Sequence, residues 1–286
     1  MNIDFVNPLV MGIMLGGLYA LIALGLSMVF GVMRLINLAH GDLVVLGSYL
    51  SYTLLRYIGL DPILSLLITV PVLFGLGFLI QQYLLRKAFA ISSEAPLIIA
   101  FGIALIIQNA VQLQFSPLQV GISTAYSMSS FKLGVMQFPM IYLLDLAAAV
   151  IVMLLYYEFL NRTYMGRAIT AASQDRKAAQ LMGINTRLIY GFAFGIAMIS
   201  AAIAGVFLGM TFPFTPVSGT SFLIIAFGVV IIGGLGSLTG TFIGGLILGL
   251  VQTFSGYFLG SSVQMLFVYL TVLVVLAIRP QGLWGR

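Results

Sequence analysis

The chain has 286 residues, of which 61% are hydrophobic and only 7% are charged, and its mean hydropathy is +1.16. Soluble domains carry about one quarter charged residues, so this composition excludes an ordinary soluble protein and indicates an integral membrane protein. The absence of cysteine excludes disulfides and thiolate metal sites, and the net charge of +5 lies largely in short loops, where it reports membrane orientation and anionic headgroups rather than nucleic-acid binding.

Nine apolar segments, taken in chain order, are candidate membrane spans: residues 9–33, 43–55, 63–81, 97–115, 140–157, 188–212, 221–234, 241–259 and 263–278. A straight helical span takes about 20 residues, so segments 43–55 and 221–234 are short. Broken helices are tolerated where protein or a water-filled cavity surrounds the exposed backbone, and paired ones often mark a transport pathway. We therefore predict an all-α integral membrane protein, a polytopic helical bundle of about 8–9 spans with broken or short helices.

The basic residues predict how the bundle is oriented. Residues 86–87, 161–187 and 279–286 hold most of the Lys and Arg, so the positive-inside bias places them in the cytoplasm. The loop 116–138 has Lys132 as its only charged residue and is expected to face outward. With nine crossings, the N-terminus lies outside and the C-terminus lies in the cytoplasm. Merging or removing a short segment would change the side of the N-terminus.

Segment 34–42 (RLINLAHGD) is a polar interruption between the first two apolar segments. A charge at mid-bilayer costs roughly 3 kcal/mol or more, so Arg34 and Asp42 are expected to avoid lipid. The segment is either a short cytoplasmic turn, in which Arg34 follows the positive-inside bias, or a polar break in which Asn37 and His40 line the pathway. A lone His with an Asp two residues later lacks the other ligands of a metal site, so no metal site is predicted.

Three further patterns concern helix packing. Gln108, Asn109 and Gln112 share one helix face, where they either hydrogen-bond to other helices or line a polar passage. Glycines recur at a spacing of four residues, as in Gly245 and Gly249, which brings backbones close together within the chain or between subunits. Segments 31–48 and 228–245 each combine a short apolar run with a glycine-rich break, which suggests a duplicated architecture.

Residues 161–187 form a charged segment between two long apolar runs. Residues 165–182 are predicted to be one helix, because Gly183 fits the left-handed position after a helix end and Ile184 can close a Schellman motif. Alanines make one side of this helix small and smooth, while Arg176 and Lys177 hold it at the surface. The segment is either an interfacial helix with basic anchors or a knob that fits a groove on a soluble partner.

The sequence lacks the common catalytic motifs. Lys87, Lys132 and Lys177 follow Arg, Phe and Arg, whereas a P-loop requires Gly directly before its Lys. The single His excludes a HExxH zinc motif, and no Ser–His–acid set is evident. We therefore expect a chain that is not an enzyme and holds no cofactor of its own.

Five segments occur in a specific order: GLYALIALGLSMVFGVMRLINLAHGD, IIQNAV, MGRAITAASQDRKAAQLMGIN, GVVIIGGLGSLTGTFIGG and RPQGLWG. Together they resemble the permease subunits of bacterial branched-chain amino acid ABC importers, a family that includes urea- and amide-import permeases. The resemblance implies a single transmembrane permease domain over 1–286 in the bacterial inner membrane, paired with a similar or identical second permease. It also implies two ATP-binding cassette subunits, which bind ATP and Mg, a periplasmic solute-binding protein, and surrounding membrane lipid.

The same resemblance implies that 161–187 is a cytoplasmic coupling loop seated in a groove of the ATPase. The positions that it marks for coupling are Gly166, Arg167, Ala171, Gln174, Asp175, Ala178, Ala179 and Gly183. The general importer motif opens with Glu-Ala-Ala, whereas Thr170 precedes Ala171 here and the acid is Asp175. The candidates for the translocation path are Asn37, His40, Gln108, Asn109 and Gln112.

The resulting hypothesis is ATP-driven import of branched-chain or other small apolar amino acids by alternating access. A permease of the same family for urea, amides or small organic acids is one alternative. An ion-coupled secondary transporter is the alternative from another class, and it would need an acid at membrane depth. The acids near spans are Asp42, Asp145 and Glu158.

Overall fold

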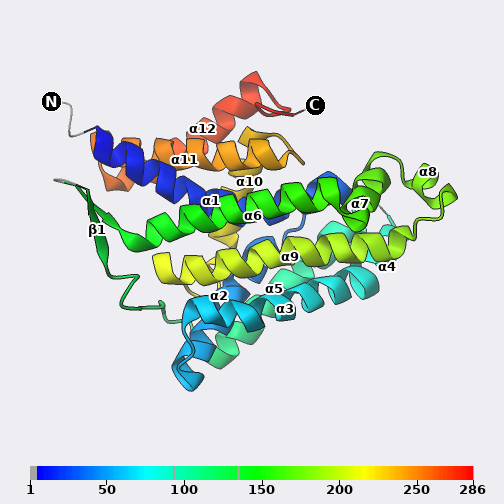
Figure 1. Cartoon of the computed structure of the whole chain (residues 1–286), viewed down its shortest axis with the longest axis horizontal. Helices are drawn as coiled ribbons and strands as arrows, with labels where there is room; N and C mark the ends of the chain where they lie inside the picture. Colours follow the sequence, from blue (N-terminus) through cyan, green and yellow to red (C-terminus); the bar gives the residue numbers. More distant parts are fainter. Residues whose placement is uncertain (1–4, 93, 134–135, 286) are drawn as a thin grey trace.

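The computed structural model describes residues 5–92, 94–133 and 136–285, and helices dominate it (Figure 1). Seven helical stretches are long and apolar enough to cross a membrane. They are α1 (Val6–Met33), α3 with its continuation through a π-helix and α4 (Pro62–Phe89), α5 (Ala95–Phe115), α6 (Met140–Arg162), α9 (Thr186–Thr211), α11 (Leu238–Leu259) and the stretch Ser261–Ile278, which contains α12 (Gln264–Ile278). Of the two segments predicted to be short, 221–234 becomes α10 (Gly219–Gly233), which has 15 residues, whereas 43–55 becomes α2 (His40–Ile58), which extends beyond the predicted bounds at both ends and has 19 residues. The predicted all-α polytopic helical bundle is confirmed, and the prediction of a short helix at 43–55 is wrong.

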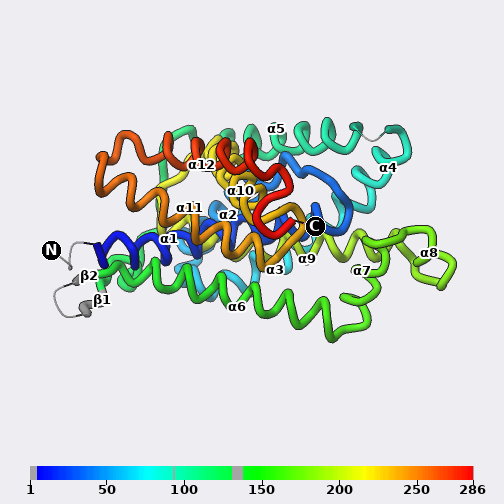
Figure 2. Tube along the Cα trace, turned by 90° about the horizontal axis from the view of Figure 1, so that it is seen from above, coloured from blue at the N-terminus to red at the C-terminus, as the bar shows by residue number. Residues whose placement is uncertain are grey.

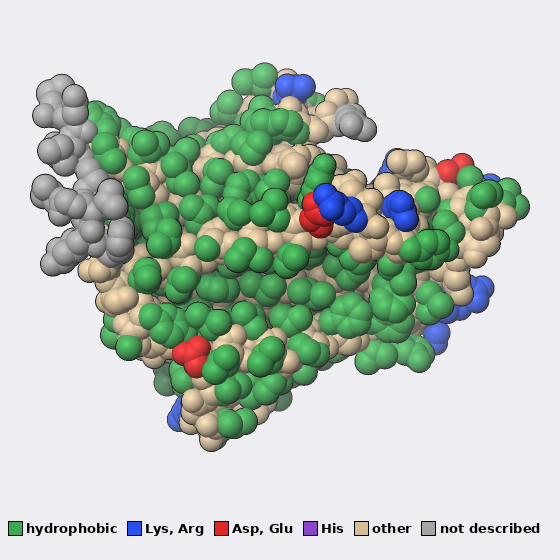
Figure 3. Space-filling view, viewed as in Figure 1, with side chains coloured by type: hydrophobic (Ala, Val, Ile, Leu, Met, Phe, Trp, Pro, Cys, Tyr) green, Lys and Arg blue, Asp and Glu red, His purple; other side chains and the backbone are tan. Residues whose placement is uncertain are grey.

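The helices run along one long axis, so the bundle has two ends (Figures 1 and 2). One end, here called the basic end, carries α4 (Arg86–Phe89), α7 (Tyr164–Gln174) and α8 (Arg176–Leu181). On the face in Figure 3, hydrophobic side chains cover the middle of the bundle, and most Lys and Arg lie toward the basic end. This arrangement is what a membrane requires of a polytopic bundle, because charged side chains avoid the hydrocarbon layer.

The opposite end, here called the hairpin end, carries two short antiparallel strands, β1 (Ser130–Leu133) and β2 (Met136–Pro139). This hairpin was not anticipated in the polar loop 116–138. The chain enters α1 at the hairpin end (Figure 1). The seven stretches that are long enough to cross a membrane roughly agree with the predicted 8–9 spans.

The two most buried helices, α1 and α9, form the centre of the bundle. In each, 78% of an apolar 18-residue stretch is buried, against at most 33% in the other long helices. The helix α1 packs mainly on α11, and α9 packs correspondingly on α3. Likewise α1 contacts α10, while α9 contacts α2. The triplets α1–α2–α3 and α9–α10–α11 therefore make corresponding contacts, because the first helix of each packs on the second and third helices of the other.

This correspondence of contacts supports a duplicated architecture, but segments 31–48 and 228–245 are not counterparts in it. Segment 31–48 contains the break between α1 and α2, whereas segment 228–245 contains the turn between α10 and α11. The structural counterpart of the first break is segment 212–218, which precedes α10. Segments 31–48 and 228–245 resemble each other because both are rich in glycine, although they occupy different positions among the helices.

Candidate functional site

The helix α2 begins inside the bundle rather than at its end. The chain leaves α1 at Arg34, which has a left-handed φ of 51° and an exposed side chain, and then turns back. At the start of α2, His40 Nε2 lies 2.8 Å from the carbonyl oxygen of Ile22. Ile22 is in the interior of α1, about 16 Å from the end of that helix. Arg34 therefore lies at the surface, whereas Asn37 and His40, which follow it, lie in the interior.

The helix α10 also begins inside the bundle, directly against the start of α2. The backbone of Gly219 contacts the backbone of Gly41 and the carboxyl group of Asp42. The non-helical backbone before α10 is satisfied by a bridge in which the N–H groups of Val120 and Phe214 donate to each other's carbonyl oxygens, over 2.9 and 2.8 Å. Thus α2 and α10 meet N-terminus to N-terminus within the bundle, at what we call the α2–α10 junction.

The α2–α10 junction combines the Asp42 carboxyl group with two helix N-termini. Helix N-termini carry partial positive charge, and the Asp42 carboxyl group lies in the first turn of α2 and against the first residue of α10. From α5, Gln108 Nε2 donates to Asp42 Oδ1 over 2.9 Å. Asp42 was not among the predicted path residues. An acid in the first turn of a short helix that follows a polar break was the sequence signal that could have identified it.

Two further predicted residues lie at this break. Asn37 is 1% exposed and its Oδ1 accepts the Ala39 N–H over 3.2 Å, but its Nδ2 has no hydrogen-bond partner among the described residues. His40 is fully buried, and within the same described ranges its Nδ1 is also without a partner. A buried polar group without a partner costs about 1–3 kcal/mol. Buried polar groups without partners are found mainly at functional sites, and favourable interactions elsewhere in the fold offset their cost.

The other two predicted path residues lie apart from the junction. Asn109 is exposed, and its Nδ2 donates within its own helix to the carbonyl oxygen of Leu105 over 2.8 Å. Gln112 is exposed on the same helix. The structure therefore places Asn37 and His40 at the start of α2, where Gln108 contacts Asp42, and leaves Asn109 and Gln112 exposed on α5.

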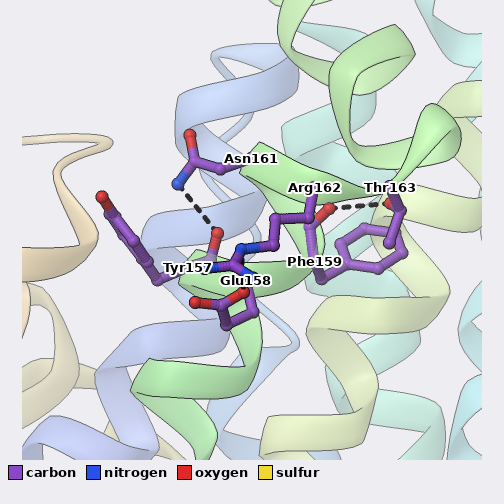
Figure 4. Close-up of polar contacts among 6 residues, drawn as sticks. All are labelled: Tyr157, Glu158, Phe159, Asn161, Arg162 and Thr163. Carbon is purple, nitrogen blue, oxygen red and sulfur yellow. Dashed lines mark hydrogen bonds and ion pairs between the residues drawn. The ribbon is translucent and has the colours of Figure 1, made fainter.

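The second candidate element, α7 with α8, is attached to the end of α6 (Figure 4). In the last turn of α6, Arg162 Nε pairs with Glu158 Oε2 at 2.6 Å. The hydroxyl of Thr163 donates to the carbonyl oxygen of Phe159 over 2.7 Å and accepts the N–H of Gly166 over 2.9 Å, which caps α7. A Cβ on Gly166 would lie 2.6 Å from the Cα of Leu160, so α7 packs directly on α6. The ion pair is exposed and contributes little, whereas the cap and the close packing fix the start of α7.

The predicted single helix 165–182 is wrong, because the helix breaks at Asp175. The backbone of Asp175 is extended, and its Oδ1 accepts the N–H groups of Lys177 and Ala178 over 2.8 and 3.0 Å. A short carboxylate side chain that bonds nearby backbone N–H groups competes with helix continuation and begins a new helix instead. The predicted end is confirmed: Gly183 has a φ of 82°, and the N–H of Ile184 donates to the Ala179 carbonyl oxygen over 3.0 Å.

Most of the predicted coupling positions are accessible at the basic end. The exposed ones are Arg167, Ala171, Gln174, Asp175, Ala178 and Gly183, while Gly166 and Ala179 are buried. The tip of this element also exposes large apolar side chains that the sequence prediction did not include, namely Leu181 at 89% and Met182 at 83%. Because α8 projects from the bundle (Figure 1), these two side chains form an apolar tip with no cover from the rest of the described chain.

Replacing Asp175 by Ala is expected to loosen α8 without unfolding the bundle. The substitution removes both hydrogen bonds that cap α8, and loss of such a cap costs about 1 kcal/mol. Amide hydrogen exchange of the purified chain should therefore be faster in α8 and unchanged in α9. The Asp175→Asn variant serves as the control, because an amide oxygen can still cap the helix. Equal exchange rates in the Ala variant and the original chain would contradict this role.

Comparisons with known proteins agree with this architecture. Residues 9–276 match the family described as branched-chain amino acid transport system / permease component. The high-affinity branched-chain amino acid transport system permease protein BraD of Pseudomonas aeruginosa is 32% identical, and the alignment covers 99% of this chain and 96% of BraD. The corresponding LivH protein of Escherichia coli K12 is 31% identical over 99% and 96% of the two chains. The solved structure of PsaBC from Streptococcus pneumoniae in complex with Fab has a TM-score of 0.54 over 99% of this chain and 94% of that chain, at 15% identity, which is a likeness of fold alone.

Proposed function

Because the chain belongs to the family of branched-chain amino acid transport system permeases, we propose that it is the membrane subunit of an ATP-driven importer. The proposed solutes are branched-chain or other small apolar amino acids, which move by alternating access. The observation that carries this proposal is the combination of two helix N-termini, those of α2 and α10, that meet inside the bundle with a projecting α7–α8 element at the basic end. The first offers a polar site within an apolar bundle, and the second offers a handle for a partner.

The proposed assembly has the chain in the bacterial inner membrane as a single permease domain. The positive-inside bias favours a cytoplasmic basic end, and hence a cytoplasmic C-terminus. A second permease, similar or identical, would pair with this one. Two ATP-binding cassette subunits would dock at the basic end and bind ATP and Mg, and a periplasmic solute-binding protein would dock at the hairpin end.

The proposed translocation path passes the α2–α10 junction. An amino acid carries an ammonium group, and the Asp42 carboxyl group at the junction offers the complementary charge. Asn37, His40 and Gln108 would contribute polar contacts at the same depth. The amides of Asn109 and Gln112 lie exposed within an otherwise apolar span, which suits contact with a second permease or the path better than contact with lipid.

The proposed coupling element is α7–α8, within segment 161–187. Because α7 packs directly on the end of α6 and its Ala172 carbonyl accepts the Tyr190 hydroxyl of α9 over 3.3 Å, movement of this element would be transmitted to both helices. The exposed positions Arg167, Ala171, Gln174 and Ala178 would face the ATPase together with the apolar tip.

Replacing both Leu181 and Met182 by Asp tests this docking. Burying two such side chains contributes about 1.5–3 kcal/mol each, so the double variant should weaken binding of the ATPase subunits at least about 100-fold. Co-purification of the ATPase subunits with the tagged permease measures the effect. The control is Leu118→Asp with Met128→Asp, a Leu and a Met of similar exposure away from α7–α8, in the segment between α5 and β1. Undiminished co-purification with the Leu181 and Met182 double variant would refute the docking role.

The transport class is tested separately. Solute-stimulated ATP hydrolysis is expected only when the permease, the ATPase subunits and the binding protein are combined. Competition by leucine, alanine, urea and small organic acids in that assembly distinguishes amino acids from the other solutes of this family. Uptake by the isolated chain in proteoliposomes under an ion gradient, without ATP, would instead favour an ion-coupled transporter.

A further inference from the structure

A small cavity of ≈ 230 Å³ at the basic end is lined by three arginines from separate parts of the chain. Arg86 comes from α4, Arg176 from the start of α8, and Arg187 from the first turn of α9. In Figure 2, these three elements gather at the same end of the bundle. The remaining wall includes the aromatic side chains of Phe89 and Tyr190. The cavity therefore combines a strongly positive rim with an apolar wall.

The positive charge of this cavity is not neutralised by the chain itself. Across the residues described, the one ion pair joins Arg162 to Glu158, so no carboxylate pairs with Arg86, Arg176 or Arg187. The guanidinium of Arg176 lies 5.5 Å from the centroid of the Tyr190 ring, a contact that orients it but leaves its charge in place. Three like charges around one cavity repel one another, and an anion placed between them would remove that cost.

The cavity is also built on an irregular and well-held piece of backbone. The segment Ile80–Leu85 is a π-helix, a form that is rare and frequently found at functional sites. It places Gln81 in the cavity wall, where this side chain is 3% exposed and its Oε1 has no hydrogen-bond partner within the described ranges. Its neighbour Gln82 donates from Nε2 to the carbonyl oxygen of Arg187 over 3.0 Å, which ties the π-helix to α9. The arginines are thus presented by elements that hold one another in place.

We propose that this cavity binds a phosphate group, and that its usual source is the headgroup of an anionic phospholipid. Guanidinium groups form paired hydrogen bonds with phosphate oxygens, and three arginines line this cavity. The cavity lies at the end of the apolar helices, where a headgroup would sit in a membrane, and basic pockets of this kind recognise anionic lipids. A bound phosphate would bridge α4, α8 and α9, and so would restrain the α7–α8 element whatever solute the protein transports.

The test uses the full-length chain in detergent, titrated with phosphatidylglycerol, phosphatidylcholine or inorganic phosphate. Phosphatidylglycerol should raise the temperature of unfolding in a saturable manner, because a ligand that binds the folded state stabilises it, and phosphatidylcholine should not. The Arg86→Gln and Arg187→Gln double variant should bind phosphatidylglycerol at least tenfold more weakly. The Arg279→Gln variant removes a positive charge that does not line the cavity and should bind as the original chain does.

The phosphate arm identifies the source of the ligand. If inorganic phosphate alone stabilises the chain and competes with phosphatidylglycerol in an arginine-dependent manner, the phosphate site stands and a free phosphate suffices. If only the lipid binds, the headgroup is the ligand. Arginine-independent binding, or no binding of either ligand, overturns the proposal. Should the Gln double variant fail to fold, the Arg86→Lys and Arg187→Lys variant keeps the charge but loses the paired geometry, and unchanged affinity in that variant would also overturn it.

Discussion

Replacing Gly219 by Ala is expected to reduce solute transport at least tenfold and to lower the free energy of unfolding by about 1–3 kcal/mol. A Cβ at this position would lie 2.7 Å from the Cγ of Asp42 and 2.8 Å from its Cα. The second of these atoms belongs to the backbone, so a change of side-chain rotamer cannot relieve the contact. The starts of α2 and α10 would have to separate, and the proposed path at the α2–α10 junction would change shape.

The matched control for this variant is Gly102→Ala in α5. No described atom lies within 4 Å of a Cβ built on Gly102, so the substitution meets open space. Alanine also favours a helix over glycine by about 1 kcal/mol, so this control should be as stable as the original chain or more so. The two measurements are solute uptake by the reconstituted assembly and denaturant unfolding of the chain in micelles. Transport by Gly219→Ala at the original rate would show that the close contact at the junction is not needed for function.

Replacing Gly16 by Leu is expected to give the largest loss of stability, about 3 kcal/mol. A Cβ on Gly16 would lie 2.6 Å from the Cα of Leu246 and 2.8 Å from the carbonyl oxygen of Gly245, so the backbones of α1 and α11 are in direct contact. In membranes, such contact between small residues replaces the hydrophobic effect as the source of helix association. Because α1 is one of the two central helices, its displacement would disturb the whole bundle.

The readout for the Gly16 variant is unfolding of the chain in mixed micelles, followed by loss of helix. The control is Gly75→Leu in α3, where a Cβ has open space around it among the described residues. The expected result is a lower unfolding midpoint for the Gly16 variant alone. Equal midpoints for the two leucine variants would mean that the close approach of α1 and α11 contributes little to stability.

Several features of the chain could be obtained from local sequence patterns. The long apolar stretches identify the helices, because a membrane span requires about 20 apolar residues regardless of what the helix packs against. The short segment 221–234 becomes α10, since its length and flanking glycine are also local properties, whereas segment 43–55 lengthens into the 19-residue α2. The Schellman end at Gly183 follows from a single glycine that can adopt a left-handed φ.

Other features depended on local competition that the pattern did not resolve. The segment 165–182 has helical composition throughout, yet the helix breaks at Asp175. The carboxylate of Asp175 accepts the backbone N–H groups of Lys177 and Ala178, and these hydrogen bonds begin a new helix instead of continuing the first one. The hairpin of β1 and β2 was missed in a loop whose polar composition fits many conformations.

The candidate sites themselves arise only when the chain is packed in three dimensions. Asp42 meets Gln108 and Gly219 because α2, α5 and α10 converge inside the bundle, and the cavity at the basic end joins arginines of α4, α8 and α9. Periodicity along the chain reports whether a residue faces lipid or protein, but it carries no information on which distant residue lies opposite. Helix length and end signals are therefore properties of neighbouring residues, whereas the polar junction and the basic cavity depend on how the helices fit against one another.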